Sequence, residues 1–275
     1  MARRFAVLSF GLEYPHRALF QEMDRTPPIE VRRALRAEVA FGCPAPGCAN
    51  PYLEYHHFDP PWRERNHHDP VGMIALCAQH HKKADGGAYT VEQLRGLKRA
   101  AEEDVRGRFD WLRNDILAIV GGNFYYETPI IFQFRAEPAI WFERDSENNM
   151  LLNIRMVTQS NEPRLSLRNN DWLVLGDPTD FESPPSGKRI QAKYASGDSL
   201  KVAFSEITCL EDAMVAHPMA SRRGLTNVRY PITTVEVEQL FGGSEWGFGP
   251  NWTKLGGIEI SGSFFSKCGT GLVWA

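Results

Sequence analysis

The feature that most constrains the fold of this chain is a dense group of histidine and cysteine residues between positions 43 and 81. Six of the eight histidines lie between His56 and His81, and three of the five cysteines lie beside or inside the same stretch. Prolines and glycines recur from residue 41 to residue 88, which predicts many turns and little apolar core. A region with so little core needs another source of stability, and a bound metal ion can supply it.

Four side chains in this stretch have the types and the spacing of a closed zinc site. Cys43 and Cys48 stand on a proline- and glycine-rich knuckle, and Cys77 is followed three residues later by His80. Thiolate sulfur and imidazole nitrogen are the usual ligands of structural zinc, which takes four of them in a tetrahedron. We therefore predict a Cys3His zinc site, the alternative being three buried cysteines that bind nothing.

The remaining histidines of the stretch predict a second, open metal site. Successive residues of a strand point to opposite faces, so His56 and His57 are not expected to bind the same ion. His81 follows His80 and points about 100° away from it around a helix. His81 can therefore join one of the two neighbouring histidines at a site that keeps positions free for a substrate.

These residues together resemble the HNH endonuclease family with its ββα-metal finger. The family signature contains a cysteine pair, an acidic residue, a His-His pair with a proline three residues later, and a Leu-Cys-x2-Cys/His-His run. Glu54, His56, His57 and Pro60 stand at matching spacing, as do residues 76–81. The resemblance covers about residues 28–100, roughly a quarter of the chain.

The resemblance implies a metal-dependent endonuclease that hydrolyses DNA phosphodiester bonds. His56 and His81 would bind the catalytic Mg2+ or Mn2+, and His57 would be the general base, a role that suits a neutral imidazole at neutral pH. The structural zinc would be held by Cys43, Cys48, Cys77 and His80. Nearby basic residues are predicted DNA contacts, with simple solvation of exposed helix faces as the alternative: Lys82, Lys83, Arg95 and Lys98, together with Arg99 and the preceding Arg32, Arg33 and Arg36.

The chain departs from the family at one position. The central asparagine of the family, which supports the base histidine, falls at Gly72, and glycine has no side chain to do this. Four residues of the preceding loop could take its place: Asn66, His67, His68 and Asp69. A rival interpretation consistent with Gly72 is a zinc-stabilised nucleic-acid or protein binding module without catalysis.

Secondary structure in the first half is predicted from turn signals and apolar periodicity. We expect a short basic helix over about 28–40, strands over 53–58 and 71–76, and a helix over 77–84. Thr90 and Gln93 form a capping-box pattern, and apolar residues recur about every 3.6 positions from Leu94 to Ile119. This periodicity predicts one long amphipathic helix, whose stripe packs on neighbouring domains or, alternatively, forms a dimer seam.

From residue 123 onward, runs rich in β-branched and aromatic residues alternate with clusters of Gly, Pro, Asn and Asp, which predicts an all-β sandwich or irregular barrel. The runs are 130–134, 150–158, 172–175, 190–194, 200–207 and 233–237. Segment 242–252 mixes tryptophan with glycine, which is typical of a ligand or target loop as well as of a plain surface loop.

The predicted architecture is therefore α+β: a zinc-stabilised ββα-metal finger, a long linking helix and a C-terminal all-β domain. The predicted parts are an N-terminal arm and basic helix (1–40), the nuclease finger (41–100), the linking helix (101–122) and the all-β domain (123–275). The last part would serve targeting, regulation by a small-molecule or protein signal, or assembly into a homodimer or higher oligomer. An assembly protein that uses the long helix is a third interpretation.

Charge and hydropathy limit the partners. The net charge of −3 argues against a protein that coats DNA by bulk charge, so DNA would be held by a local basic patch. No stretch approaches the ~18 apolar residues of a membrane helix, and the start of the chain does not have the pattern of a signal peptide. We expect a cytoplasmic protein without a membrane partner, and defence against foreign DNA is a hypothesis from architecture alone.

Overall fold

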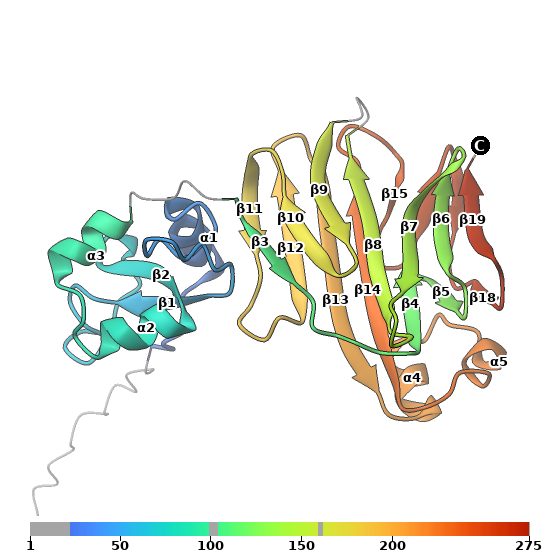
Figure 1. The fold of residues 1–275 in the computed structure, drawn as a ribbon, viewed down its shortest axis with the longest axis horizontal. Helices are drawn as coiled ribbons and strands as arrows, with labels where there is room; N and C mark the ends of the chain where they lie inside the picture. Colours follow the sequence, from blue (N-terminus) through green and yellow to red (C-terminus); the bar gives the residue numbers. More distant parts are fainter. Residues whose placement is uncertain (1–22, 99–103, 159–161, 275) are drawn as a thin grey trace, which may run out of the picture.

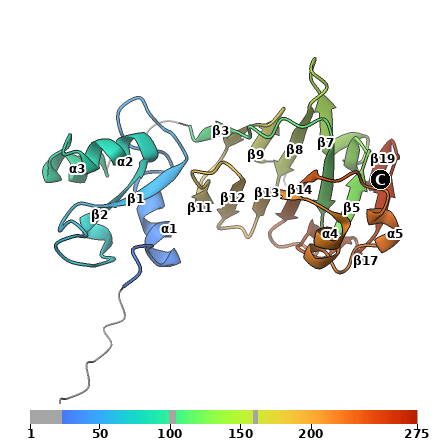
Figure 2. The ribbon, with the colours of Figure 1, turned by 90° about the horizontal axis from the view of Figure 1, so that it is seen from below.

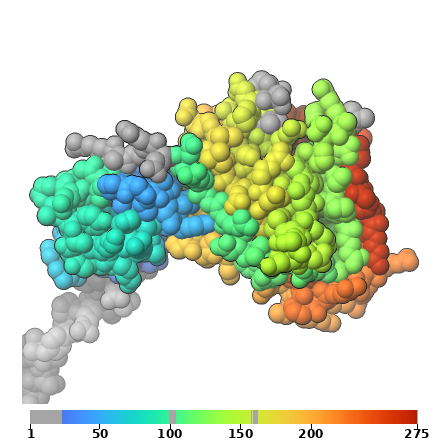
Figure 3. Space-filling view, viewed as in Figure 1, coloured from blue at the N-terminus to red at the C-terminus, as the bar shows by residue number. Residues whose placement is uncertain are grey.

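The computed structural model describes residues 23–98, 104–158 and 162–274, which form two lobes lying side by side (Figures 1 and 3). The smaller lobe, here called the N-terminal module, comprises residues 29–97, and the larger lobe, the β-sandwich, comprises residues 104–274. Each lobe has a hydrophobic cluster of its own. The fold is mixed α+β and mostly β, as predicted.

The N-terminal module is a two-stranded hairpin with helices packed against it. Its elements are α1 (Ile29–Glu38), β1 (Leu53–His57), the 3-10 helix η1 (Pro70–Gly72), β2 (Met73–Cys77), α2 (Ala78–Asp85) and α3 (Val91–Leu97). β1 and β2 are antiparallel, with Leu53 opposite Cys77 and His57 opposite Met73. β2 is buried along its whole length because α1 and α2 both pack against it. The short helices and strands predicted for this region are confirmed to within a few residues.

The predicted long helix is wrong. The capping box of Thr90 and Gln93 does begin a helix, but α3 ends at Leu97. Residues 104–115 contain only the short strand β3 (Arg106–Arg108), and Ile116 to Val120 form the strand β4. The predicted linking helix 101–122 therefore does not exist within the described residues 104–122. Val105 and Phe109, part of the predicted stripe, are instead buried in the sandwich core.

The β-sandwich consists of two facing sheets, seen as two layers in Figure 2. One sheet has the strand order β19-β6-β7-β8-β9-β10-β3, and the other has the order β11-β12-β13-β14-β15-β16-β17, with β4, β5 and β18 joined to it beside β14. The remaining bounds are β5 (Asn123–Tyr126), β6 (Ile130–Phe134), β7 (Glu137–Arg144), β8 (Met150–Val157), β9 (Pro163–Arg168), β10 (Asp171–Val174), β11 (Pro178–Glu182), β12 (Arg189–Tyr194), β13 (Ser199–Ile207), β14 (Ile232–Leu240), β15 (Gly247–Phe248), β16 (Thr253–Leu255), β17 (Ile258–Ile260), β18 (Phe264–Ser266) and β19 (Thr270–Trp274).

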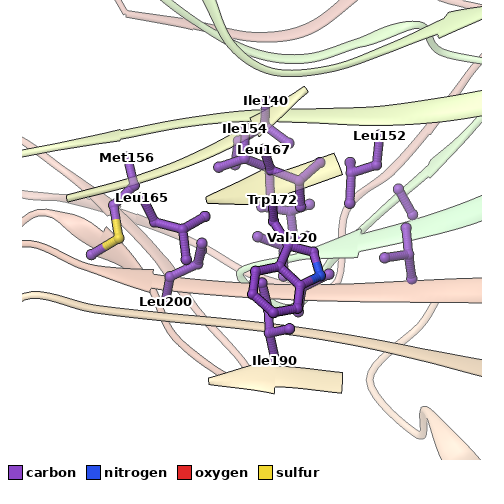
Figure 4. Packing of buried hydrophobic residues seen from close by; sticks show 14 of the residues in the cluster. Val120, Ile140, Leu152, Ile154, Met156, Leu165, Leu167, Trp172, Ile190 and Leu200 are labelled. Atoms are coloured by element: carbon purple, nitrogen blue, oxygen red, sulfur yellow. The ribbon is translucent and has the colours of Figure 1, made fainter. Parts of the chain in front are cut away.

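The core of the sandwich lies between the two sheets. Alternate residues of β12 and β13 point inward, as the period of two in a strand requires. Figure 4 shows Trp172 of β10 among aliphatic side chains of both sheets, including Ile154 and Ile190. The sandwich predicted from the runs of β-branched residues is thus confirmed, although it begins at β3 and not at residue 123.

β4 explains why the long helix was predicted. All five of its residues are apolar and buried, because its two faces lie in different clusters. Ile116, Ala118 and Val120 face the sandwich core, whereas Leu117 and Ile119 face a second cluster on the outside of the sheet. Two short helices, α4 (Leu210–Ala216) and α5 (Arg222–Leu225), contribute to that outer cluster. The prediction of an all-β domain therefore needs correction.

A buried ion pair joins the two lobes. Arg36 of α1 is only 2% exposed, and its guanidinium donates to the Asp180 carboxylate of β11 at 2.6 and 3.2 Å and to the Tyr55 hydroxyl at 2.8 Å. Burial lowers the pKa of Arg36, but Tyr55 and Asp180 raise it by more, so the guanidinium stays charged. Arg33 donates to the same carboxylate from an exposed position. Two of the arginines predicted to contact DNA are therefore engaged at the junction between the lobes.

The same junction contains a second set of contacts. The hydroxyl of Tyr52 donates to the backbone carbonyl of Arg108 at 2.8 Å, and its ring meets Trp172 edge-on. Tyr52 also forms an isolated parallel bridge with Ser183. The junction thus combines polar and aromatic contacts from both sheets of the sandwich. Across the described ranges, no helix is long and apolar enough to cross a membrane.

We predict that Asp180→Ala destabilises the chain by about 3 kcal/mol, because it leaves the buried Arg36 guanidinium without its carboxylate. Arg33→Ala removes the exposed half of the same contact and should cost less than about 1 kcal/mol. Urea denaturation of both variants measures the two values. Equal losses in the two variants would contradict the assignment of Arg36 as the buried anchor.

Candidate metal centres

The four predicted zinc ligands lie together at one end of the hairpin. The Sγ atoms of Cys43 and Cys77 lie 3.4 and 3.3 Å from Nδ1 of His80, and the Sγ atoms of Cys48 and Cys77 lie 3.8 Å apart. Ligand atoms at normal distances around a tetrahedral zinc ion stand about 3.6–3.8 Å from one another. The cluster of Cys43, Cys48, Cys77 and His80 could therefore hold a metal ion such as zinc.

Three chain segments bring these ligands together. The knuckle turns at Gly47, whose φ of 69° is in the left-handed region that favours glycine. Its two ends are tied by the N–H of Cys43 bonding to Asn50 and the N–H of Cys48 bonding to Ala45. Cys77 ends β2 and precedes the first residue of α2, so His80 stands one turn further along, over the knuckle.

The chemistry of this cluster also fits a cation. Burial raises the pKa of the Cys43 thiol to about 12, with smaller upward contributions from Cys77 and Cys48. Without a positive charge nearby, the Cys43 thiol therefore stays protonated. A divalent cation reverses the preference, because a coordinating thiol loses its proton outright.

A second group of possible ligands lies between β1 and α2. Ligand atoms of His56, His81 and Asp85 all lie within 4.8 Å of one another. The rings of His56 and His81 are 5.1 Å apart and nearly perpendicular. Burial lowers the pKa of His56, and His81 lowers it further, whereas Asp85 opposes the shift. His56 is therefore in the neutral form that binds metals.

The arrangement of the nitrogens in this group fits a bound cation. Nδ1 of His81 lies 2.9 Å from a carboxylate oxygen of Glu54, whereas Nε2 of His81 is buried and has no hydrogen-bond partner among the described residues. Nδ1 of His56 lies 3.3 Å from a carboxylate oxygen of Asp85. Buried polar atoms of this kind are rare unless they have a function. A carboxylate that holds the second nitrogen of a histidine is the usual support of a metal ligand.

The structure adds Asp85 to the two ligands predicted for this site. Asp85 stands four residues after His81 on α2, and residues at this spacing share one face of a helix. The sequence carried this signal, because His81 and Asp85 are separated by one helical turn. It was missed because the family signature ends at the second histidine of the pair.

His57, the predicted base, points into a separate aromatic enclosure. It is 4% exposed, and its ring lies 4.7 Å from Trp62, 5.2 Å from His67 and 6.0 Å from His68. Both ring nitrogens are buried and have no hydrogen-bond partner among the described residues. Burial, together with the neighbouring His67 and His68 side chains, lowers the pKa of His57 to about 4, although the His67 backbone opposes the shift. The imidazole is thus neutral and able to accept a proton.

The predicted DNA contacts fall into two groups. Lys82 and Lys83 are exposed on α2 and form no ion pair within the described part of the chain. Arg95 instead pairs with Asp59, and Lys98 pairs with Glu38 and donates to the carbonyl of Pro70. These two side chains of the α3 region hold the loop between β1 and β2. Arg99 lies outside the described residues.

The predicted ligand loop lies in the sandwich. Residues 242–246 and Trp252 of this segment line an open hollow of about 600 Å³ together with residues of β16 and β17. Lys254 lies over the ring of Trp252 and pairs with Glu259. A small-molecule or protein signal could bind in this hollow, and regulation of the domain by such a signal stays a prediction.

Comparison with known proteins gives no match: no family model, no curated protein and no solved structure matches this chain.

We predict that the purified chain carries one metal ion in the Cys3His cluster, and that Cys48→Ser releases it. Binding of structural zinc is worth about 10–16 kcal/mol at neutral pH, so its loss should unfold the N-terminal module. Cys268→Ser, at a cysteine outside both clusters, should retain the metal. Elemental analysis and circular dichroism measure both effects, and a folded wild-type chain without bound metal would refute the prediction.

Proposed function

We propose that this chain is a metal-dependent HNH-type endonuclease that hydrolyses DNA phosphodiester bonds. The observation that carries the proposal is that one ββα unit holds a four-ligand cluster, a separate three-ligand cluster and an unpartnered histidine. A binding module would need only the four-ligand cluster. The three-ligand cluster leaves coordination positions for phosphate and water, as a catalytic site requires.

In this proposal the two clusters have different tasks. Cys43, Cys48, Cys77 and His80 hold a structural zinc ion. His56, His81 and Asp85 hold the catalytic ion, and two imidazoles beside one carboxylate suit Mn2+ better than Mg2+. A divalent ion bound there supplies positive charge to a phosphate oxygen and to the leaving oxygen. Glu54 fixes the ring of His81, so that Nε2 faces the site.

His57 acts as the general base. Its neutral imidazole takes a proton from the attacking water, and its unpartnered nitrogens leave it free to do so. An anionic phosphate close by raises the pKa of the ring and so strengthens the base. Lys82 and Lys83 follow His81 on the same helix and contact the DNA backbone near the site.

The β-sandwich is firmly attached to the module that carries this site. The buried pair of Arg36 and Asp180 fixes α1 to β11, so the N-terminal module and the sandwich face the DNA together. This supports a targeting or regulatory role for the sandwich, with the hollow beside Trp246 as the place for a signal.

We predict that Asp85→Asn and His81→Ala each raise the Mn2+ concentration needed for half-maximal cleavage by about 10–100-fold, with partial recovery of activity at high Mn2+. A ligand is removed in both variants while the base remains. Plasmid cleavage titrated with Mn2+ after EDTA treatment measures the effect. Glu147→Gln, a change at an exposed carboxylate of the sandwich, is the control. An unchanged Mn2+ titration in both ligand variants would exclude this site.

We predict that His57→Ala lowers kcat by about 10²–10⁴-fold and leaves KM, DNA binding and bound zinc unchanged. A base contributes to the transition state and not to ground-state binding. His217→Gln, at a histidine of the sandwich, should cut as the wild type does. If the wild-type chain binds DNA but does not cut it with any divalent metal, the binding-module interpretation replaces the nuclease.

A further inference from the structure

We propose that His67 is the positioning residue for His57. Its ring packs against the ring of His57 and so supports the base, the role that the resemblance would give to a side chain at position 72. The proposal rests on the proposed function, because it concerns the residue assigned as the base. Four residues of the loop were candidates to support His57, and their contacts show which of them lies in the right place.

The ring of His67 lies edge-on to the ring of His57. The two ring centres are 5.2 Å apart at 88°, and His67 is 7% exposed. Trp62 packs on His57 at 4.7 Å from another direction. These two rings restrict rotation of the imidazole without using either of its nitrogens. Packing of these rings therefore helps to orient the base.

His67 is itself fixed by hydrogen bonds. The backbone N–H of Asp69 donates to its Nδ1 at 3.2 Å, so Nδ1 is the acceptor and Nε2 carries the ring proton. Nε2 then donates to the carbonyl of Pro60 at 2.9 Å. The ring thus spans the loop between β1 and β2 from one end to the other. The His67 ring therefore has a fixed orientation, and a residue that positions another side chain needs one.

Position 72 cannot carry the supporting side chain. A Cβ atom on Gly72 would lie 1.9 Å from the carbonyl oxygen of Asp59 and 3.0 Å from Cε1 of His67. The carbonyl of Gly72 accepts from the N–H groups of Phe58 and Asp59, directly after His57. The space beside Gly72 is therefore filled by backbone and by His67.

The other three candidates are engaged or distant. Asn66 is exposed. His68 bonds to the carbonyl of Asp24, and its ring is 6.0 Å from that of His57. Asp69 is exposed and caps η1 by accepting from the N–H of Val71. Only His67 combines burial, a fixed ring and edge contact with the base.

The test compares His67→Ala, His67→Gln and Asn66→Ala in the full-length chain. His67→Ala should lower kcat by about 10–100-fold with unchanged KM and unchanged Mn2+ titration, because a misplaced base affects the transition state alone. His67→Gln keeps a donor to the carbonyl of Pro60 and should recover part of the rate. Asn66→Ala should cut as the wild type does. Bound zinc and urea unfolding, measured for each variant, exclude loss of the folded chain.

A second measurement separates this proposal from the proposed function. The NMR signals of the His57 ring should shift and broaden in His67→Ala and keep their positions in Asn66→Ala. Unchanged signals, or equal kcat in wild type and His67→Ala, would overturn the positioning role. A wild-type chain that cuts no DNA would overturn the nuclease, and the His57 signals would still decide whether His67 holds the ring. If His67→Ala does not fold, the same comparisons with His67→Gln decide.

Discussion

The convergence of three sulfur atoms and one imidazole nitrogen at the end of the hairpin is the constraint on which the N-terminal module depends. The module has one small apolar cluster, and the loop between its two strands is longer than the strands themselves. The cluster brings the knuckle, the end of β2 and the first turn of α2 together, and a cation held there would tie them into one unit. That unit sets the direction of α2, and α2 in turn carries His81 and Asp85 toward His56.

Residue types at fixed short spacings were readable from the sequence, whereas contacts across loops were not. Cys77 and His80 are three residues apart, so a helical turn alone brings them together. Asp85 could have been found by the same reasoning from His81. His67 could not, because its place beside His57 depends on the path of a loop that also contains an exposed neighbour, Asn66. Short-range geometry follows from secondary structure, and loop geometry follows from the whole set of tertiary contacts.

The failure of the long-helix prediction has a similar origin. A strand buried on both faces is a continuous apolar run, and its spacing is compatible with a helical stripe as well as with a strand. β4 is such a strand, because α4 and α5 cover the side that faces away from the sandwich core. The sequence also could not show that three of the basic residues predicted to contact DNA form ion pairs within the chain. The carboxylates concerned are distant in sequence: Arg36 pairs with Asp180, Arg95 with Asp59 and Lys98 with Glu38.

The parallel pairing of β4 with β14 has a consequence for the order in which the chain folds. Residues 116–120 pair with residues 233–237, and β5 and β6 pair with β18 and β19 from still later in the chain. Contacts between residues so distant in sequence close large loops and make folding slow. The hairpin and helices of the N-terminal module make mostly local contacts. On the ribosome, this module can complete its fold before β14 has been synthesised. Until then the edge of β4 is unpaired and needs protection from other chains.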